Sequence, residues 1–261
     1  QQLIVKEEGI LAGVDIARKV FQKFDPSLKM TEYISDGAHV RPGDIAFVVE
    51  GPVRSLLQTE RIMLNIMQRM SGVATMTDWY QQRLAGLNTK VLDTRKTTPG
   101  MRLLEKEAVK IGGGSNHRIG LFDMILIKDN HVDFAGGIPQ AVAAAKKWCA
   151  DNGKNLQIEL EVRNTEEIDQ ALAAGVDRIM LDNFTPARTM EAVKHIRAYK
   201  APDAQLQADS HVHNGTDVEI ESSGGITLDT LRDYGECGVD FISVGALTHS
   251  VKGLDMSFKA C

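Results

Sequence analysis

The sequence predicts an α/β protein in two parts, a small N-terminal sheet with a helix against it and an incomplete α/β barrel of six or seven strands. After residue 88, short apolar strand segments alternate regularly with helical segments, which is typical of βα units around a parallel sheet or barrel. Six such units are too few for an eight-stranded barrel. We therefore expect a barrel that does not close, with the N-terminal sheet covering its open side.

The first 88 residues predict a sheet and two helices. Segment 14–24 carries apolar residues at helical spacing and stops at Asp25-Pro26. A long helix is expected at 60–84, with a break or bend near Ser71-Gly72, and its methionine stripe indicates core or subunit contact more than a cofactor site. Strands are expected at 3–8, 29–35 and 44–50.

The second part predicts six strands with helices between them. The strands are expected at 90–94, 124–128, 156–162, 178–182, 218–222 and 240–244, and the helices at 102–111, 138–150, 165–174, 186–199 and 227–236. The connection 202–217 is long and polar, and we expect it to be a mobile loop. Its His211 and His213 lack a third ligand placed by spacing, which disfavours a metal site there.

Composition narrows the class of partner. The 261 residues are 43% hydrophobic, enough for one large domain or two smaller ones with real cores. The net charge of -5 predicts no general attraction to nucleic acid or to an anionic membrane. Three widely spaced cysteines favour a reducing cytoplasm. Residues 1–8 lack a signal-peptide pattern and the chain opens without an initiator Met, so we expect N-terminal residues to be missing.

Cations gather where predicted strands stop. Arg95 and Lys96 follow the first barrel strand, Lys128 ends the second, and His117-Arg118 comes after three glycines. A charge run is usually a solvated helix face, but such a face mixes both signs at helical spacing. Because ligands bind at the carboxyl ends of strands in these folds, the joint pattern predicts an anion site, with His117 and Arg118 held on a loop over it.

Carboxylates end the next two strands. Glu161 and Asp182 offer the hard oxygen ligands that Mg²⁺ prefers, although salt bridges to Lys96 or Lys128, or helix capping, are the structural alternative for each. Glu159 shares a strand face with Glu161 and is an ambiguous alternate.

Glycine turns end the last two strands. They comprise Ser223-Gly224 and Gly245, and they predict a phosphate cradle of backbone N–H groups and a helix N-terminus.

These residues resemble the quinolinate phosphoribosyltransferase family, the type II phosphoribosyltransferases. The resemblance spans nearly the whole chain and its ordered motifs are highly specific. They are TRKTTPG at 94–100, GGG at 112–114 leading to NHR at 116–118, KDNH at 128–131, EV at 161–162, LDN at 181–183, ESSGG at 221–225 and VGALTH at 244–249.

The resemblance implies a fold and a reaction. The implied fold has an N-terminal α/β sandwich at 1–88, completed by 250–261, and an incomplete barrel at 89–249. The implied assembly is a homodimer, or a higher oligomer of dimers, in which subunits share active sites. The implied reaction, part of de novo NAD biosynthesis, converts quinolinate and phosphoribosyl pyrophosphate to nicotinate mononucleotide, pyrophosphate and carbon dioxide, with Mg²⁺.

The resemblance also implies residue roles. The quinolinate pocket would hold Arg95, His117, Arg118 and Lys128, with Arg61 reaching in from a neighbouring subunit. Lys96 and Lys128 would neutralise phosphate charge, Glu161 and Asp182 would hold Mg²⁺ and ribose, and Ser223, Gly224 and Gly245 would seat the 5′-phosphate. The four residues expected to carry catalysis are Lys96, Lys128, Glu161 and Asp182.

Three rival functions stay open. A nicotinate phosphoribosyltransferase would bind one carboxylate, whereas the density of cations favours a dicarboxylate. A paralogue associated with molybdenum transport is expected to depart from the KDNH segment that is present here. A non-catalytic phosphate-binding barrel would have no reason to keep both carboxylates alongside both lysines.

Overall fold

The computed structural model describes residues 1–200, 215 and 217–261. The predicted loop with His211 and His213 therefore lies mostly outside the described residues. Within the described part, no helix combines the length and apolar character needed to cross a membrane. The chain forms two compact units, the first made of Gln1–Gln82, Asp93–Asn116 and Gly245–Cys261, the second of Arg83–Leu92 and His117–Val244.

A four-stranded antiparallel sheet organises the first unit. Its strand order is β12 (Met256–Lys259), β1 (Gln2–Val5), β5 (Ile45–Glu50) and β3 (Lys29–Glu32). Leu3 on β1 pairs with Phe258 on one side and with Phe47 on the other. The C-terminal segment thus completes the N-terminal sheet. A separate two-stranded pair is formed by β2 (Gly9–Ile10) and β4 (His39–Val40). β1 ends at Val5, before the end of the predicted strand at 3–8.

Two helices bury the apolar side chains of this sheet. On α1 (Val14–Phe24), predicted with these bounds, Phe21 lies 6.2 Å from Phe47 and 6.1 Å from Phe258 between ring centroids. Met63 and Met67 of α2 (Val53–Arg83) join the same core, which confirms a core role for the methionine stripe. The predicted start at residue 60 is wrong, because the helix begins directly after Pro52, a residue that suits a helix start.

The predicted break at Ser71-Gly72 is also wrong, since α2 continues through both residues, and a bend there stays a prediction. Small residues are needed there for packing. The Ser71 hydroxyl accepts a hydrogen bond from the Ala12 N–H at 2.8 Å, and a methyl group added at Gly72 would overlap the Lys252 carbonyl oxygen.

The glycine-rich loop after α3 (Arg102–Ile111) packs on α2 in the same way. A methyl group at Gly112 would overlap the Ala74 carbonyl oxygen, and one at Gly114 would lie 2.7 Å from Thr77 Cγ2. The bare glycine backbone thus allows the loop to approach α2 closely.

Six parallel strands form the sheet of the second unit. Their order is β6 (Lys90–Leu92), β11 (Phe241–Ser243), β10 (Glu219–Ser223), β9 (Arg178–Asp182), β8 (Ile158–Val162) and β7 (Ile125–Ile127). β6 and β7 are the two edges of this sheet, so the barrel is open. The predicted incomplete α/β barrel is confirmed, with a strand observed at each of the six predicted positions.

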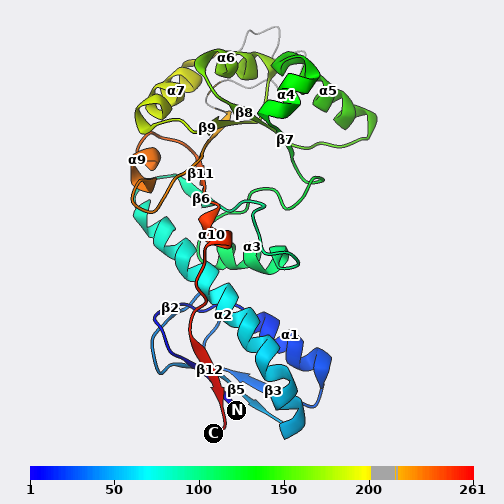
Figure 1. Ribbon diagram of the computed structural model, residues 1–261, viewed down its shortest axis with the longest axis vertical. Helices are drawn as coiled ribbons and strands as arrows, with labels where there is room; N and C mark the ends of the chain where they lie inside the picture. Colours follow the sequence, from blue (N-terminus) through cyan, green and yellow to red (C-terminus); the bar gives the residue numbers. More distant parts are fainter. Residues whose placement is uncertain (201–214, 216) are drawn as a thin grey trace. The chain divides into compact units, whose positions relative to one another are not determined.

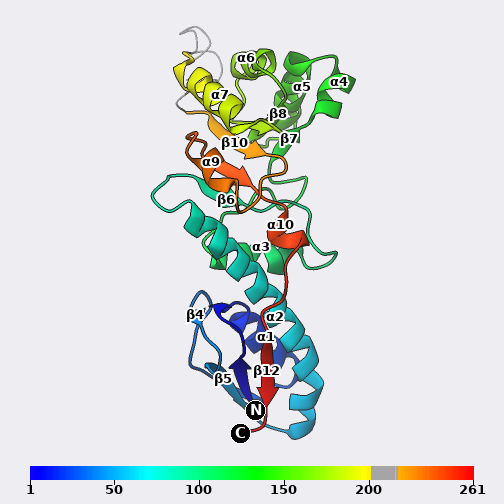
Figure 2. The ribbon, with the colours of Figure 1, turned by 60° about the vertical axis from the view of Figure 1, so that its left-hand side comes forward.

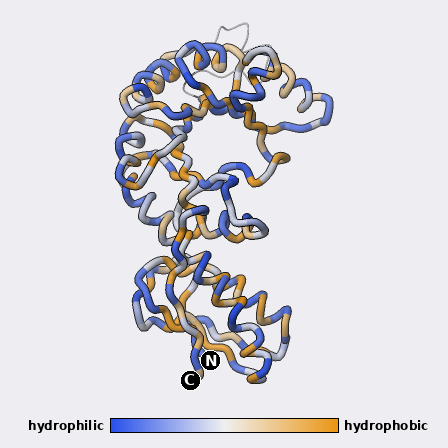
Figure 3. The backbone as a smooth tube through the Cα atoms, in the orientation of Figure 1, coloured by the Kyte–Doolittle hydropathy of each residue, from blue (hydrophilic) through white to orange (hydrophobic). Residues whose placement is uncertain are grey.

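Helices cover the outer face of this curved sheet (Figures 1 and 2). They are α4 (Asp129–Ala135), α5 (Ile138–Asp151), α6 (Thr165–Ala174), α7 (Pro186–Ala198) and α9 (Leu231–Gly235). Hydrophobic residues concentrate along the strands, and the helices present hydrophilic residues outward (Figure 3). The predicted start of α6 is confirmed, because Asn164 Oδ1 accepts the Glu167 N–H at 2.9 Å.

The compact units do not follow a single cut in the sequence. Residues 93–116 and 245–261 pack with the N-terminal residues, which places the short helix α10 (Ala246–His249) in the first unit. A domain boundary at residue 88 stays a prediction.

Candidate active site

The carboxyl edge of the six-stranded sheet collects four predicted site residues of the second unit. Lys128 follows β7, Glu161 lies near the end of β8, Asp182 ends β9 and Ser223 ends β10. Lys128 Nζ lies 2.8 Å from Glu161 Oε2. The side chain of Lys128 is 47% exposed and that of Glu161 is 9% exposed, so a largely buried carboxylate meets a lysine that solvent still reaches.

The ends of β9 and β10 are locked together behind these side chains. Asn183 adopts a left-handed conformation at φ 54° and donates its backbone N–H to the Ser223 carbonyl oxygen at 2.9 Å. A methyl group at Gly224 would overlap Asn183 Oδ1, so glycine is required at that position. The side chain of Asn183 also donates to Asp182 Oδ2 at 2.7 Å, which fixes the carboxylate that ends β9.

The predicted helix at 227–236 begins only at Leu231, because Thr227 to Thr230 form a turn in which the Thr227 N–H bonds to Thr230 Oγ1 at 3.1 Å. Only the predicted helix start is therefore wrong, and the phosphate cradle expected at the glycine turns stays a prediction. A role for the Ser223-Gly224 turn itself stays a prediction.

His117 and Arg118 lie on the predicted loop, between α3 and β7, but both residues are buried. Their exposed fractions are 6% and 8%. The Arg118 backbone N–H donates to His117 Nδ1 at 2.7 Å, so the other ring nitrogen, Nε2, carries the proton and faces Glu159 Oε2 at 2.9 Å. Two buried carboxylates on the strands favour such a donor beneath the surface, and a position of this loop over the site stays a prediction.

Those carboxylates belong to a charged cluster inside the sheet. Glu221 Oε2 lies 3.6 Å from His117 Nε2 and 3.5 Å from Arg178 NH1, and Arg178 also binds Glu219 at 2.7 Å. Burial raises the pKa of Glu159 to about 7, and burial together with the nearby charge of Glu159 raises the pKa of Glu221 to about 8.

The ligand atoms of His117, Glu159 and Glu221 lie within 4.8 Å of one another, the proximity expected of metal ligands. Arg178 already supplies positive charge, which favours an ion network. Sequence reasoning left Glu159 ambiguous and missed Glu221 and Arg178. The available signal was charged residues inside strands that are otherwise apolar, as in IELEV and EIESS.

In the first unit, Arg95 and Lys96 project from the loop 94–100 as exposed side chains. The backbone of this loop is well held. The Lys96 N–H donates to Thr94 Oγ1 at 3.0 Å, and the Lys96 carbonyl oxygen accepts from Thr248 Oγ1 at 2.8 Å. Gly245 lies beside the lysine stem, since a methyl group there would be 3.2 Å from Lys96 Cδ. The structure thus brings Gly245 and Lys96 together.

A buried ion pair fixes the start of this loop. Lys106 Nζ lies 2.5 Å from Asp93 Oδ1, and both residues are at most 2% exposed. Asn116 donates to Asp93 Oδ2 at 2.6 Å and to the Lys106 carbonyl oxygen at 2.8 Å. The Asp93 carboxylate therefore fixes both the start of the loop 94–100 and Asn116, the residue before His117. Sequence reasoning did not single out Asp93 or Lys106 for this role.

Arg61 lies on the exposed side of α2, beside Leu57 and Ile62, which are 59% and 54% exposed. Among the described residues its side chain makes no ion pair or hydrogen bond, and its predicted role toward a neighbouring subunit stays a prediction.

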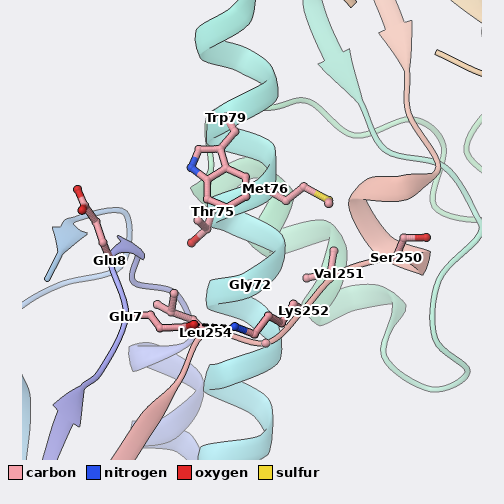
Figure 4. Close-up of a pocket in the computed structure, with 11 residues that line it drawn as sticks. Glu7, Glu8, Gly72, Thr75, Met76, Trp79, Ser250, Val251, Lys252 and Leu254 are labelled. Atoms are coloured by element: carbon pink, nitrogen blue, oxygen red, sulfur yellow. Dashed lines mark hydrogen bonds and ion pairs between the residues drawn. The ribbon is translucent and has the colours of Figure 1, made fainter. Parts of the chain in front are cut away.

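A pocket in the first unit lies away from the predicted residues. It is lined by Gly72, Thr75 and Trp79 of α2, by Glu7 and Glu8, and by the C-terminal segment 250–254, with an ion pair between Glu7 and Lys252 (Figure 4). None of the predicted site residues is among its lining residues. The charged side chains that line it are two carboxylates and one lysine, a balance that does not suit a site for anions.

Family comparisons cover almost the whole chain. Residues 1–71 match the family described as quinolinate phosphoribosyl transferase, N-terminal domain, and residues 73–259 match the family described as quinolinate phosphoribosyl transferase, C-terminal domain.

Named relatives agree with this match. A chloroplastic nicotinate-nucleotide pyrophosphorylase (carboxylating) of Oryza sativa subsp. japonica is 43% identical, with 98% of this chain and 68% of that protein covered. A probable nicotinate-nucleotide pyrophosphorylase (carboxylating) of Bacillus subtilis is 41% identical, with 98% and 81% covered.

Solved structures share the fold. The nicotinate-nucleotide pyrophosphorylase of Francisella tularensis is 42% identical with a TM-score of 0.86, over 98% of this chain and 84% of that one. Human nicotinic acid phosphoribosyltransferase is 16% identical with a TM-score of 0.58, over 98% and 69%, a likeness of fold alone.

The buried cluster predicts a pH-dependent stability. Glu221 keeps its proton in the folded state up to about pH 8, whereas in the unfolded chain its pKa returns to 4.5. Between these values the folded state binds more protons, so the free energy of unfolding falls as pH rises, by at most about 1.4 kcal/mol per pH unit. Because glutamine does not titrate, Glu221→Gln should flatten this fall in urea unfolding measured from pH 5.5 to 7.5.

The control is Glu191→Gln, which changes an exposed carboxylate on α7 and should keep the wild-type slope. Equal slopes for wild type and Glu221→Gln would contradict a protonated Glu221.

Proposed function

The chain belongs to the quinolinate phosphoribosyltransferase family, and on that premise we propose specific roles for its strand-end residues. It transfers phosphoribosyl from phosphoribosyl pyrophosphate to quinolinate with decarboxylation, giving nicotinate mononucleotide, pyrophosphate and carbon dioxide in NAD biosynthesis. The observation that carries this conclusion is the family match over residues 1–71 and 73–259.

Quinolinate carries two carboxylates, and we assign its binding to Arg95, Arg118, Lys128 and His117, with Arg61 contributed by a second subunit. The planar guanidinium of arginine can grip a carboxylate at two points. Arg118 is buried, so its attraction for an anion is screened less by water than that of an exposed cation. His117 supports this assignment, because its Nδ1 holds the Arg118 backbone.

Phosphoribosyl pyrophosphate brings several negative charges, which Lys96 and Lys128 would neutralise. The 5′-phosphate is assigned to Ser223, Gly224 and Gly245, which are polar or glycine positions at strand ends. Catalysis in this scheme is mainly positioning and electrostatic stabilisation of the departing pyrophosphate.

The donor chemistry of Glu161 and Asp182 fits Mg²⁺, since both are carboxylates at the ends of adjacent parallel strands. The ion pair of Glu161 with Lys128 also fits, because that lysine can turn to phosphate when Glu161 takes up a cation. When bound, Mg²⁺ would offset charge on the pyrophosphate.

The bonding changes balance without a further co-reactant. The quinolinate ring nitrogen forms a bond to ribose C1, and the bond from C1 to the pyrophosphate oxygen breaks with its electron pair leaving on pyrophosphate. The ring nitrogen is then positive, so the bond to the adjacent carboxylate can break, leaving its electrons on the ring carbon as carbon dioxide departs. A proton from water completes the product.

We also propose a homodimer and a cytoplasmic location. The dimer is supported by the exposed apolar residues beside Arg61, and the location by three cysteines that are all free.

Product analysis tests the function directly. Incubation with Mg²⁺, phosphoribosyl pyrophosphate and quinolinate should yield nicotinate mononucleotide and carbon dioxide by mass spectrometry, and nicotinate in place of quinolinate should yield none. Product from nicotinate alone would move the assignment to the one-carboxylate rival, and no product from either acceptor would refute the activity of this chain.

Removal of the metal-binding carboxylates tests the Mg²⁺ assignment. Glu161→Gln and Asp182→Asn should each raise the Mg²⁺ concentration for half-maximal turnover by roughly tenfold or more, because each loses a charged oxygen ligand. Titration of activity with Mg²⁺ measures this, with Glu191→Gln as the exposed-carboxylate control. An unchanged Mg²⁺ requirement in both variants would remove these residues from the metal site.

Subunit complementation tests the origin of Arg61. Arg61→Ala and Lys128→Ala should each be nearly inactive, but in a mixed dimer one site receives Arg61 from one subunit and Lys128 from the other. Random mixing should therefore restore about a quarter of wild-type activity, because one site in four is intact in a symmetric dimer pool.

As a control, each variant alone is taken through the same mixing procedure. If activity does not return although size-exclusion chromatography and a tag pull-down show mixed dimers, Arg61 does not act across the interface.

A further inference from the structure

Lys96 depends on its backbone for position. Its side chain is exposed on a loop, and a lysine has four rotatable bonds and a single charged atom, so a small displacement of the backbone moves the charge widely. The loop is nevertheless held at both sides of Lys96, by Thr94 at its N–H and by Thr248 at its carbonyl oxygen.

Arg69 of α2 binds the segments that provide this hold. Its guanidinium donates to the carbonyl oxygens of Thr248 and Val251, the second at 3.2 Å, and to Thr98 Oγ1 at 3.3 Å. It also pairs with Glu105 on α3, with NH2 at 2.7 Å from Oε1. One side chain thus links α2 to α3, to the Lys96 loop and to α10.

Glu105 makes this arrangement rigid. Its side chain is fully buried, and a buried carboxylate without a cation is strongly unfavourable, so Arg69 is fixed in place. The other oxygen of Glu105 accepts the Thr98 N–H at 3.0 Å, two residues after Lys96. The same ion pair therefore restrains the loop directly and, through Thr248, the Lys96 carbonyl.

We propose that Arg69 is a positioning residue for Lys96, acting through Glu105 and Thr248 to hold the loop 94–100 in the geometry that phosphoribosyl transfer requires. The inference rests on the proposed role of Lys96 and extends it to a residue that touches no substrate. A misplacement of a catalytic group by about 1 Å can cost on the order of a hundredfold in rate.

The primary test compares Arg69→Gln with wild type by two measurements. Hydrogen–deuterium exchange of peptides covering 94–101 should speed up, and turnover should fall roughly ten- to a hundredfold while the KM for quinolinate changes little. Arg18→Gln is the control, because it breaks another ion pair of the first unit, with Glu32, and should change neither measurement.

Arg69→Gln leaves Glu105 buried without its cation and the variant could fail to fold. The double variant Arg69→Gln with Glu105→Gln removes both charges and should fold with the same loosened loop and reduced turnover.

A matched pair at Thr248 isolates the last link. Thr248→Val keeps the shape but removes the donor to Lys96, and should lower turnover about tenfold, whereas Thr248→Ser restores the hydroxyl and should recover most of it. In a Lys96→Ala background, Thr248→Val should have no further effect, because its loss acts through that lysine.

The outcomes separate the inference from the proposed function. If the wild-type protein makes no nicotinate mononucleotide, the proposed function is refuted. Hydrogen–deuterium exchange still shows, independently of activity, whether Arg69 holds the loop. If wild type is active, and Arg69→Gln has a loosened loop but normal turnover, the positioning role is overturned. It is also overturned if Thr248→Val lowers turnover by the same factor in the Lys96→Ala background as in wild type.

Discussion

Compensation of buried charge is the constraint on which both units depend. In the first unit, Asp93 and Glu105 have no exposed surface and are offset by Lys106 and Arg69. In the second, Arg178 supplies positive charge beside Glu221, the Nε2 of a neutral His117 faces Glu159, and burial raises the pKa of both carboxyls, which favours their uncharged form. An unpaired charge at any of these positions would cost more than most single contacts contribute, so each pair fixes the chain segments that carry it.

These pairs also explain how loops acquire the precision of a site. The side chains that face solvent, such as Arg95 and Lys96, gain little order from their own contacts. Their positions follow from buried partners a few residues away in the sequence, Asp93 before the loop and Glu105 after it. The exposed cations assigned to substrate binding are thus positioned by buried ion pairs that are not assigned to substrate contact.

Periodicity and turn residues were enough to predict most elements and the open barrel. The bounds of α1, α3 and α6 follow from apolar spacing and stop signals such as Asp25-Pro26 and Gly112. The burial of His117 could not be predicted, because it depends on partners distant in sequence, whereas the start of α2 after Pro52 is a local signal that was missed. Glu159 and Glu221 become neighbours only when β8 and β10 flank β9 in the sheet. Strand-end position brought Lys128 and Glu161 to one edge of the sheet, where they form an ion pair, but spacing contains no information on which buried acids pair with which cations.

The pairing of β12 with β1 has a consequence for the order in which the chain can fold. Val5 pairs in register with Met256, so the sheet is complete only when a loop of roughly 250 residues has been closed. During synthesis, β1 exposes an unpaired edge and the apolar side chain of Leu3 until the whole barrel segment has emerged. The N-terminal sheet is therefore the last part of this chain to be finished, and its early strands need protection from other partners for most of the time that the ribosome takes to make the protein.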